Sequence, residues 1–348
     1  MRARWAFCFL LVSVSLLAQA DEIDDLVRAN MAEEHINGIA VGIVVDGVLQ
    51  ERRFYGIANL ETRTPVRPGT VFKIASLSKA FCASVTMMLI EEGKLSLEDR
   101  LVDVLPGLPE AWGEVRIKHM LSHTSGIPRP RGFQFSAQYT PDEYVALFEG
   151  TELREEPGST YRYNNFGFAT LAQVVHKLSG KTLREFVTER ILEPLGMKAT
   201  HYYEMGRIVP NRANGYRWRN DVHTNANPAR PRVYDGSGGL LTTLFDYAQW
   251  DKALRSDFLL SAEIKEKMFS RFTLNDGSLG TYGMGWFPDE FDGEKIVWHY
   301  GETQGFTSYV VRGLESGVTV FLFRNGSGEI AHDLTRGILE RVKDDIGR

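Results

Sequence analysis

Strand-forming sequence lies at both ends of this 348-residue chain, and this arrangement limits how the chain can fold. Near the N-terminus, IAVGIVVDGVLQERRFYG places apolar residues on both sides of Asp46-Gly47, a dipeptide typical of two-residue hairpin turns. Three more strand-like runs lie near the C-terminus: KIVWHYG, GFTSYVVRG and VTVFLFRNG. The simplest arrangement is one sheet assembled from both chain ends.

The middle of the chain has helical patterning instead. The expected helices are Ser78–Glu92, Leu171–Leu178, Leu183–Ile191 and Leu244–Arg255, with a final amphipathic helix at Ile330–Val342. We therefore predict a mixed α/β (α+β) fold, in which an antiparallel sheet is flanked by helices and a mostly helical region is inserted. The α/β part should span about residues 21–75 and 290–348, and the helical part about residues 76–289.

The first twenty residues have the pattern of a secretory signal peptide. Arg2 and Arg4 precede an apolar run that ends in Ala18-Gln19-Ala20 before Asp21. A membrane anchor is the alternative, but the apolar run is shorter than a spanning helix requires. We expect cleavage near Ala20, a mature domain from residue 21 to residue 348, and a periplasmic or secreted location without a stable membrane anchor.

Charge and cysteine content exclude several classes of protein. The formal charge is −5, and removal of two arginines with the signal would make it −7, so an acidic chain without a basic block is not expected to bind nucleic acid.

Of the two cysteines, Cys8 would leave with the signal and Cys82 would stay without a partner. Cys82 lies on an apolar helix, where we expect a buried small hydrophobic residue. The sequence does not indicate an oligomeric state.

The stretch KIASLSKAF raises the main functional question. Ser76 and Lys79 are three residues apart at the start of a predicted helix, so both side chains would lie on one helical face. In a poorly solvated cleft, Lys79 could be neutral and take the serine proton, which suits covalent acyl transfer. The alternative is a helix-capping serine and a solvated lysine. Ser-x-x-Lys alone does not decide between these interpretations.

Further motifs accompany this pair, and together they resemble one family. In chain order they are the N-terminal hairpin, VFKIASLSKAF, IKHMLSHTSGIP, EEPGSTYRYNNFGF, ILEPLGM, GSGGLLTT, YGMGW and WHYGETQGF. The chain is similar over nearly its whole mature length to the β-lactamase-related serine hydrolases, a group that includes class C β-lactamases, D-alanyl-D-alanine carboxypeptidases and family VIII esterases. This resemblance implies the β-lactamase/transpeptidase-like, penicillin-binding-protein type of fold.

The resemblance also implies roles for individual residues. Ser76 would be the nucleophile, and Lys79 and Tyr163 would move protons. Asn165 would orient the substrate, and His299 would tune the tyrosine electrostatically. The backbone N–H groups of Ser76 and Glu302 would form the oxyanion hole. Which of Lys79 and Tyr163 is the base in each half-reaction stays open, because two coupled groups titrate as a pair.

The third motif departs from the family pattern. Class C β-lactamases have lysine where this chain has His299, and Tyr300 and Glu302 stand where hydroxyl groups usually hold a substrate carboxylate. We expect Tyr300, Gly301, Glu302 and Thr303 to contact the substrate. Because Glu302 would repel an anion, the sequence favours a neutral or cationic ester or peptide.

No cofactor is expected. His119 and His123 have the i, i+4 spacing of some zinc ligands, but the glutamate of the zinc-protease motif is absent and no third ligand is apparent. We therefore predict no metal site, although a metallohydrolase is kept as an alternative.

The sequence predicts an exported serine hydrolase with a Ser76 acyl-enzyme, cleaving an ester or amide in a small molecule or a peptide, including peptides that contain D-amino acids. A β-lactamase or a D-alanyl-D-alanine carboxypeptidase is one alternative within the family. An alternative of another class is a sensor that binds penicillin or peptide without turnover.

Overall fold

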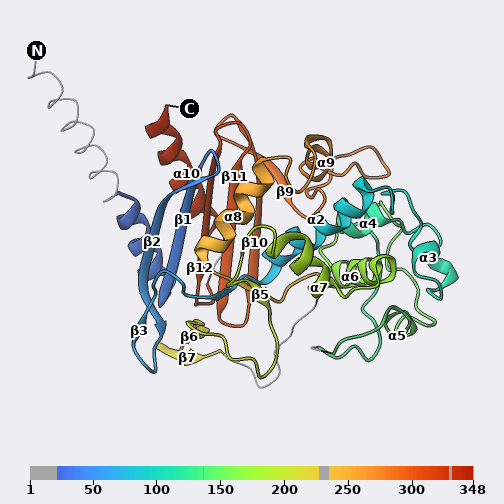
Figure 1. Ribbon diagram of the computed structural model, residues 1–348, viewed down its shortest axis with the longest axis horizontal. Helices are drawn as coiled ribbons and strands as arrows, with labels where there is room; N and C mark the ends of the chain where they lie inside the picture. The colour runs from blue at the N-terminus through green and yellow to red at the C-terminus, as the bar shows by residue number, and fades with distance from the viewer. Residues whose placement is uncertain (1–21, 136, 227–234, 329–330, 348) are drawn as a thin grey trace, which may run out of the picture.

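A seven-stranded antiparallel sheet is the largest element of the fold (Figure 1). The computed structural model describes residues 22–135, 137–226, 235–328 and 331–347. The strand order is β3-β2-β1-β12-β11-β10-β9. The bounds are β1 (Gly38–Val45), β2 (Val48–Asn59), β3 (Thr64–Pro65), β9 (Phe287–Phe291), β10 (Glu294–Thr303), β11 (Phe306–Gly313) and β12 (Val318–Arg324). The predicted sheet from both ends of the chain is therefore confirmed.

The pairing of β1 with β12 joins the two ends of the chain. It runs antiparallel from Ile39 opposite Arg324 to Val45 opposite Val318. The predicted hairpin between β1 and β2 is present, with Asp46 and Gly47 both at positive φ (50° and 76°), as a type I′ turn requires.

Helices cover both faces of the sheet, which explains why its central strands are apolar throughout. On β12, Val320 and Leu322 face one buried cluster, whereas Phe321 and Phe323 face the other. The first face is covered by α10 (His332–Ile346) and by the helical residues 22–33, and the second by α8 (Leu244–Arg255). Strands buried on both faces do not need polar alternation.

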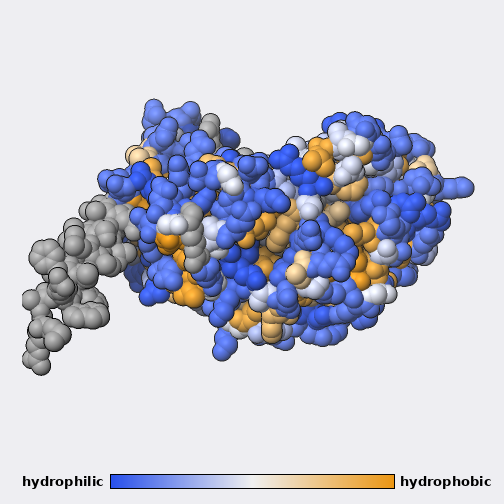
Figure 2. Space-filling view, turned by 90° about the horizontal axis from the view of Figure 1, so that it is seen from above, coloured by the Kyte–Doolittle hydropathy of each residue, from blue (hydrophilic) through white to orange (hydrophobic). Residues whose placement is uncertain are grey.

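A mostly helical region lies beside the sheet (Figure 1). The helices here are α2 (Ser78–Glu91), α3 (Leu101–Val104), α4 (Ile117–Leu121), α5 (Pro141–Ala146), α6 (Asn165–Ser179), α7 (Leu183–Val187), α9 (Ala262–Met268), the 3₁₀ turns η1 (Ala75–Leu77) and η2 (Glu110–Trp112), and the π-helical turn η3 (Thr188–Leu192). Helix α2 is buried around almost its whole circumference, including Cys82, whose predicted burial is confirmed. In the space-filling view, hydrophobic residues gather between two lobes of a mostly hydrophilic surface (Figure 2).

Two small sheets were not predicted, and all but one of their strands lie inside the region expected to be helical. One has the order β4-β8-β5, formed by β4 (Phe72–Lys73), β8 (Leu240–Thr242) and β5 (His201–Tyr202), and the other is the hairpin β6 (Tyr216–Arg219) and β7 (Val222–Asn225). At Gly38, Gly215 and Gly305, the backbone lies so close to another segment of the chain that a side chain would not fit. Helix α8 packs on the large sheet although it lies within the segment expected to form the helical part.

No helix in the described part of the chain is long and apolar enough to cross a membrane. The signal peptide predicted for residues 1–20 lies outside the described residues.

A buried ion pair ties α8 to the sheet and predicts a measurable stability effect. Arg312 of β11 donates to Asp251 of α8, and both side chains are almost fully buried, so burial lowers the pKa of Arg312 to about 10. Asp251→Asn should leave a buried guanidinium without its counter-charge and lower the free energy of unfolding by about 3 kcal/mol. Chemical denaturation measures this change.

The matched control is Asp257→Asn. Asp257 is exposed and pairs with Lys265, so its replacement should change the free energy of unfolding by less than about 1 kcal/mol. Equal effects of the two substitutions would contradict the role assigned to the buried pair.

Candidate active site

Ser76 lies in the 3₁₀ turn η1, immediately before α2. The N-cap of α2 is Leu77, and no side chain caps this helix end. The hydroxyl of Ser78, rather than that of Ser76, donates to the carbonyl of Ala75 at 2.6 Å. Ala75 has a positive φ of 47°, a backbone conformation that is uncommon for a residue with a Cβ and is typical of functional turns. The capping interpretation of Ser76 is therefore wrong.

Lys79 is buried rather than solvated, so the second part of that interpretation is also wrong. Its Nζ lies 3.1 Å from Ser76 Oγ, 2.8 Å from Asn165 Oδ1 and 2.8 Å from the carbonyl oxygen of Ser237. Burial holds the pKa of Lys79 well below its ordinary value, because none of these three partners is a carboxylate that could stabilise the charged form.

The partners of a neutral Lys79 set the direction of its hydrogen bond with Ser76. A neutral amine has two N–H donors and one lone pair. The amide oxygen of Asn165 and the carbonyl oxygen of Ser237 can only accept, so they take both N–H groups. The lone pair then faces the Ser76 hydroxyl, which donates its proton toward Nζ. This is the arrangement that a serine nucleophile and its base require.

Tyr163 packs beside this pair. The Nζ atom of Lys79 lies 4.7 Å from the centre of the Tyr163 ring. Burial raises the pKa of Tyr163 well above its ordinary value, and the Ser76 side chain only partly offsets this effect. At neutral pH, Tyr163 is thus a protonated phenol in the resting site, and the choice of base between Lys79 and Tyr163 stays a prediction.

His123 holds the backbone of the Tyr163-Asn164-Asn165 element, a contact that sequence reasoning missed. The N–H of Asn164 donates to His123 Nδ1 at 3.1 Å, and the buried His123 ring lies 4.4 Å from the Tyr163 ring. The Asn164 side chain accepts from Phe166 N and so caps α6, which begins at Asn165. In the sequence, the i, i+4 spacing of His119 and His123 draws attention to these residues, but it does not indicate that His123 contacts Asn164 and Tyr163.

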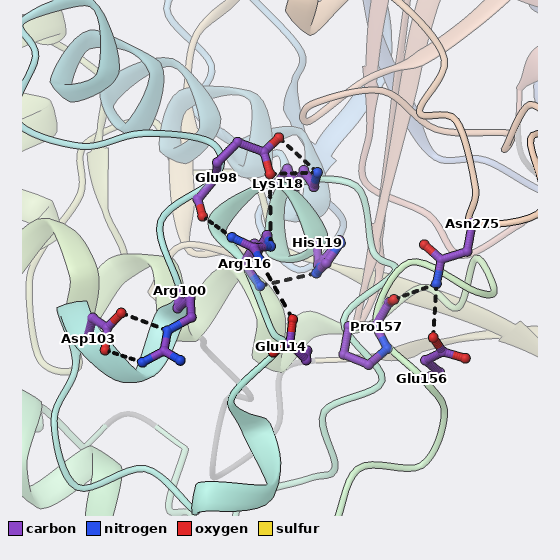
Figure 3. Close-up of polar contacts among 10 residues, drawn as sticks. All are labelled: Glu98, Arg100, Asp103, Glu114, Arg116, Lys118, His119, Glu156, Pro157 and Asn275. Atoms are coloured by element: carbon purple, nitrogen blue, oxygen red, sulfur yellow. Dashed lines mark hydrogen bonds and ion pairs between the residues drawn. The ribbon is translucent and has the colours of Figure 1, made fainter.

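His119 has a separate structural contact. Its Nδ1 accepts from the backbone N–H of Arg116 at 3.1 Å, within the polar contacts around α4 (Figure 3). The two histidines therefore use their Nδ1 atoms for different backbone N–H groups. Within the described ranges, no three His, Cys, Asp or Glu side chains are grouped closely enough to hold a metal ion.

His299 is fully buried on β10, and its tautomer follows from its partners. Nδ1 lies 2.7 Å from the carbonyl oxygen of Tyr300, which can only accept, so Nδ1 carries the proton. Nε2 then accepts from the Tyr282 hydroxyl at 2.8 Å. Burial and the nearby Lys79 lower the pKa of His299 to about 3, so it is neutral at physiological pH. It does not replace the cationic lysine of class C enzymes.

The direct partner of His299 is therefore Tyr282, a residue that was not singled out from the sequence. The His123 ring lies 4.7 Å from the Tyr282 ring and 4.4 Å from the Tyr163 ring. A buried row of rings thus connects His299 to Tyr163. Electrostatic tuning of Tyr163 by His299 stays a prediction.

Strand β10 approaches the turn that carries Ser76 very closely. A Cβ added to Gly301 would lie 2.2 Å from the Ile74 carbonyl oxygen, 2.5 Å from Ser308 Oγ and 3.0 Å from Ser76 N. Only glycine permits this approach. It brings the backbone around Glu302 next to the Ser76 N–H, as the predicted oxyanion hole requires, although that assignment stays a prediction.

A cavity of about 670 Å³ opens beside Ser76. Asn165, Glu302 and Thr303 line it together with Ser76, whereas Tyr300 and Gly301 are not among its lining residues. Gly301 instead faces the Ser76 turn, and Tyr300 packs with the rings of Phe287 and Trp298. Of the four residues predicted to contact the substrate, two therefore line this cavity.

These features define a β-lactamase/transpeptidase-like fold with a Ser-Lys-Tyr cluster at the edge of its sheet. A family profile described as Beta-lactamase matches residues 23–343. The chain belongs to the Beta-lactamase family, as the sequence motifs predicted.

Individual relatives agree with this assignment. The chain is 29% identical to penicillin-binding protein 4* of Bacillus subtilis over 85% of this chain and 69% of that protein. It is 23% identical to protein flp of Staphylococcus aureus over 92% of this chain and 66% of that protein, so the relatives are longer than this chain.

Two solved structures are similar to the fold. The octameric penicillin-binding protein homologue from Pyrococcus abyssi has a TM-score of 0.80 and 28% identity, over 94% of this chain and 78% of that one. D-amino acid amidase from Ochrobactrum anthropi, solved with L-phenylalanine amide, has a TM-score of 0.75 and 21% identity, over 94% of this chain and 99% of that one. At this identity, the second likeness supports the fold alone.

The burial of Lys79 predicts a pH-dependent stability effect. Because the folded-state pKa of Lys79 is below its unfolded value near 10.5, the unfolded chain binds more protons between these two values. In that interval, Lys79 makes the free energy of unfolding rise with pH. Lys79→Met removes this contribution. The stability of the variant relative to the wild type should therefore decrease as the pH rises toward 10.5.

Urea denaturation at several pH values measures this difference. The matched control is Lys118→Met, because Lys118 lies in a solvent-accessible pair with Glu98. A difference between wild type and Lys79→Met that does not change with pH would contradict the lowered pKa of Lys79.

Proposed function

We propose that this chain is an exported serine hydrolase that cleaves an ester or amide bond through an acyl-enzyme on Ser76. The observation that carries the proposal is the contact between Ser76 Oγ and the buried Lys79 amine, whose other two partners accept both of its N–H groups. A poorly solvated amine with its lone pair directed at a serine hydroxyl is a general base placed for acyl transfer.

The proposed sequence of steps uses the neighbouring groups. Lys79 takes the proton of Ser76 while Oγ attacks the carbonyl carbon. The developing oxyanion is held by the N–H groups of Ser76 and Glu302. Tyr163, which is protonated in the resting site, passes a proton to the leaving group, and Lys79 restores the Tyr163 proton. A water molecule then attacks the acyl-enzyme, and the same groups move protons in the reverse order.

Asn165 has two roles in this proposal. Its Oδ1 accepts from Lys79 and so orients the amine, and its side chain lines the cavity, where it can contact substrate. His299, which is neutral, supports the ring row behind Tyr163 rather than contributing a positive charge. Export to the periplasm or the exterior is part of the proposal and rests on the sequence of residues 1–20.

Two alternatives stay open to experiment. A β-lactamase or a D-alanyl-D-alanine carboxypeptidase would use the same acyl-enzyme and differ in substrate, and the names of the relatives keep penicillins and D-amino acid amides among the compounds to test. A sensor that is acylated without turnover would show a burst of one equivalent and no steady rate.

The first test is intact-mass analysis after exposure to an activated acyl ester, a penicillin and a D-amino acid amide. The wild type should gain a transient acyl mass with at least one compound and then lose it with turnover. Ser76→Ala should show no adduct and should lose at least about 10⁴-fold in kcat/KM. Persistence of the adduct in Ser76→Ala, or loss of activity with a chelator in the wild type, would overturn the proposal.

The second test uses the close approach of β10 to Ser76. Gly301→Ala places a methyl group against the Ile74 carbonyl and should displace the oxyanion-binding backbone, with a loss of at least about 10²-fold in kcat. The control Gly337→Ala lies on α10, where an added Cβ meets nothing within 4 Å, so activity should not change. Equal activity of the two variants would argue against an oxyanion hole at this position.

A further inference from the structure

The cavity beside Ser76 has a wall that the proposed mechanism does not use. Lys73 of β4 and Arg217 and Arg219 of β6 line it, and Glu302 is its only lining carboxylate among the residues that the structure describes. Three cations therefore oppose one acidic group. The sequence favoured a neutral or cationic substrate because only Glu302 and Tyr300 were considered. The excess of positive charge in the cavity favours an anionic substrate instead.

Burial makes the cationic side of the balance stronger. Glu302 and Arg219 are both exposed, so water screens both charges, whereas Arg217 is partly buried and Lys73 is largely buried. The Lys73 Nζ faces the rings of Tyr203 and Phe306 at 4.9 Å and 5.5 Å from their centres. Burial and the nearby Arg212 lower the pKa of Lys73 to about 8, so it is still mostly charged at pH 7.

The three cations also have no counter-charge of their own. Over the described ranges of the chain, no ion pair involves Lys73, Arg217 or Arg219. Most other arginines of these ranges whose side chains are partly buried have a carboxylate partner, as Arg184 has in Asp235. Lys73 and Arg217 are partly buried, and partly buried cations without a partner are unfavourable unless an anion offsets their charge; Arg219 is exposed and adds its charge at the rim of the cavity.

The hairpin that carries the two arginines is held firmly in place. The ring of Trp218, between them, stacks on the ring of His35 at 4.2 Å. At the start of β6, the Tyr216 hydroxyl donates to Glu61 at 2.6 Å and accepts from Leu60 N. The backbone that carries Arg217 and Arg219 is therefore positioned before any substrate enters, which reduces the entropy lost on binding.

We propose that Lys73, Arg217 and Arg219 form a subsite for an anionic group on the substrate, so that the preferred ester or amide carries a carboxylate on the part that lies in this cavity. The inference rests on the proposed Ser76 hydrolase activity and adds the substrate class. Arginine suits this role because its planar fork matches the geometry of a carboxylate.

The test uses three p-nitrophenyl esters with acyl chains of equal length: hexanoate, which is neutral, the adipate monoester, which ends in a carboxylate, and 6-aminohexanoate, which ends in an ammonium group. For the wild type, kcat/KM should be at least about tenfold higher for the adipate ester than for the hexanoate ester, and lowest for 6-aminohexanoate. This preference should shrink as ionic strength rises from about 0.05 M to about 0.5 M.

The variants are Arg217→Gln, Arg219→Gln, their combination, and Lys73→Gln. Each should lower the ratio of kcat/KM for adipate to that for hexanoate, and the double variant should bring the ratio close to unity. The control is Arg67→Gln, because Arg67 is exposed and does not line the cavity. Arg67→Gln should keep the wild-type ratio. The inference is overturned if the wild type shows no preference for adipate, or if the double variant keeps the ratio of the control.

A binding measurement separates failure of the subsite from failure of the proposed function. Titration calorimetry on Ser76→Ala compares the binding of adipic acid monomethylamide, which carries a carboxylate, with that of neutral N-methylhexanamide. This measurement does not depend on hydrolysis of either compound. Tighter binding of the carboxylate compound, weakened by Arg217→Gln, supports the subsite even if no ester is hydrolysed. Equal binding together with hydrolysis of all three esters through Ser76 would reject the subsite and retain the hydrolase.

Discussion

The antiparallel pairing of β1 with β12 is the constraint on which the rest of this structure depends. It closes the chain on itself, because β1 comes from the first part of the sequence and β12 from the last. Through β11, the same sheet carries β10 to its position beside η1, where Gly301 lies against the Ser76 turn. The residues of the site therefore depend on contacts between segments more than two hundred positions apart in sequence.

Burial disfavours the charged form of each titratable side chain in the site. The same lack of solvent lowers the pKa of Lys79 and raises the pKa of Tyr163, so it favours the neutral form of both side chains. His299 and His123, also buried, are neutral for the same reason. A low-dielectric cluster of this kind reduces stability but keeps a lysine lone pair available, and the well-packed helix α2 and sheet supply the stabilising contacts that offset it.

Local sequence patterns predicted most of the regular structure. The turn at Asp46-Gly47 and helix Leu244–Arg255 were predicted from dipeptide chemistry and periodicity alone. The helix that follows Tyr163 was predicted to begin several residues too late: it starts at Asn165, where the Asn164 side chain caps it. The short strands β4 to β8 were missed because two to four residues carry little periodicity, and their pairing depends on distant partners.

By itself, the sequence determined the class of fold, the Ser76-Lys79 pair and membership of a family, since these depend on residue type, spacing and order. Only the tertiary structure decided that Lys79 is buried against Asn165 and Ser237, that His299 is a neutral partner of Tyr282, and that Arg217 and Arg219 face the cavity beside Ser76. The physical reason is that the charge state of a side chain and the identity of its neighbours are set by burial and long-range packing, which spacing along the chain does not encode.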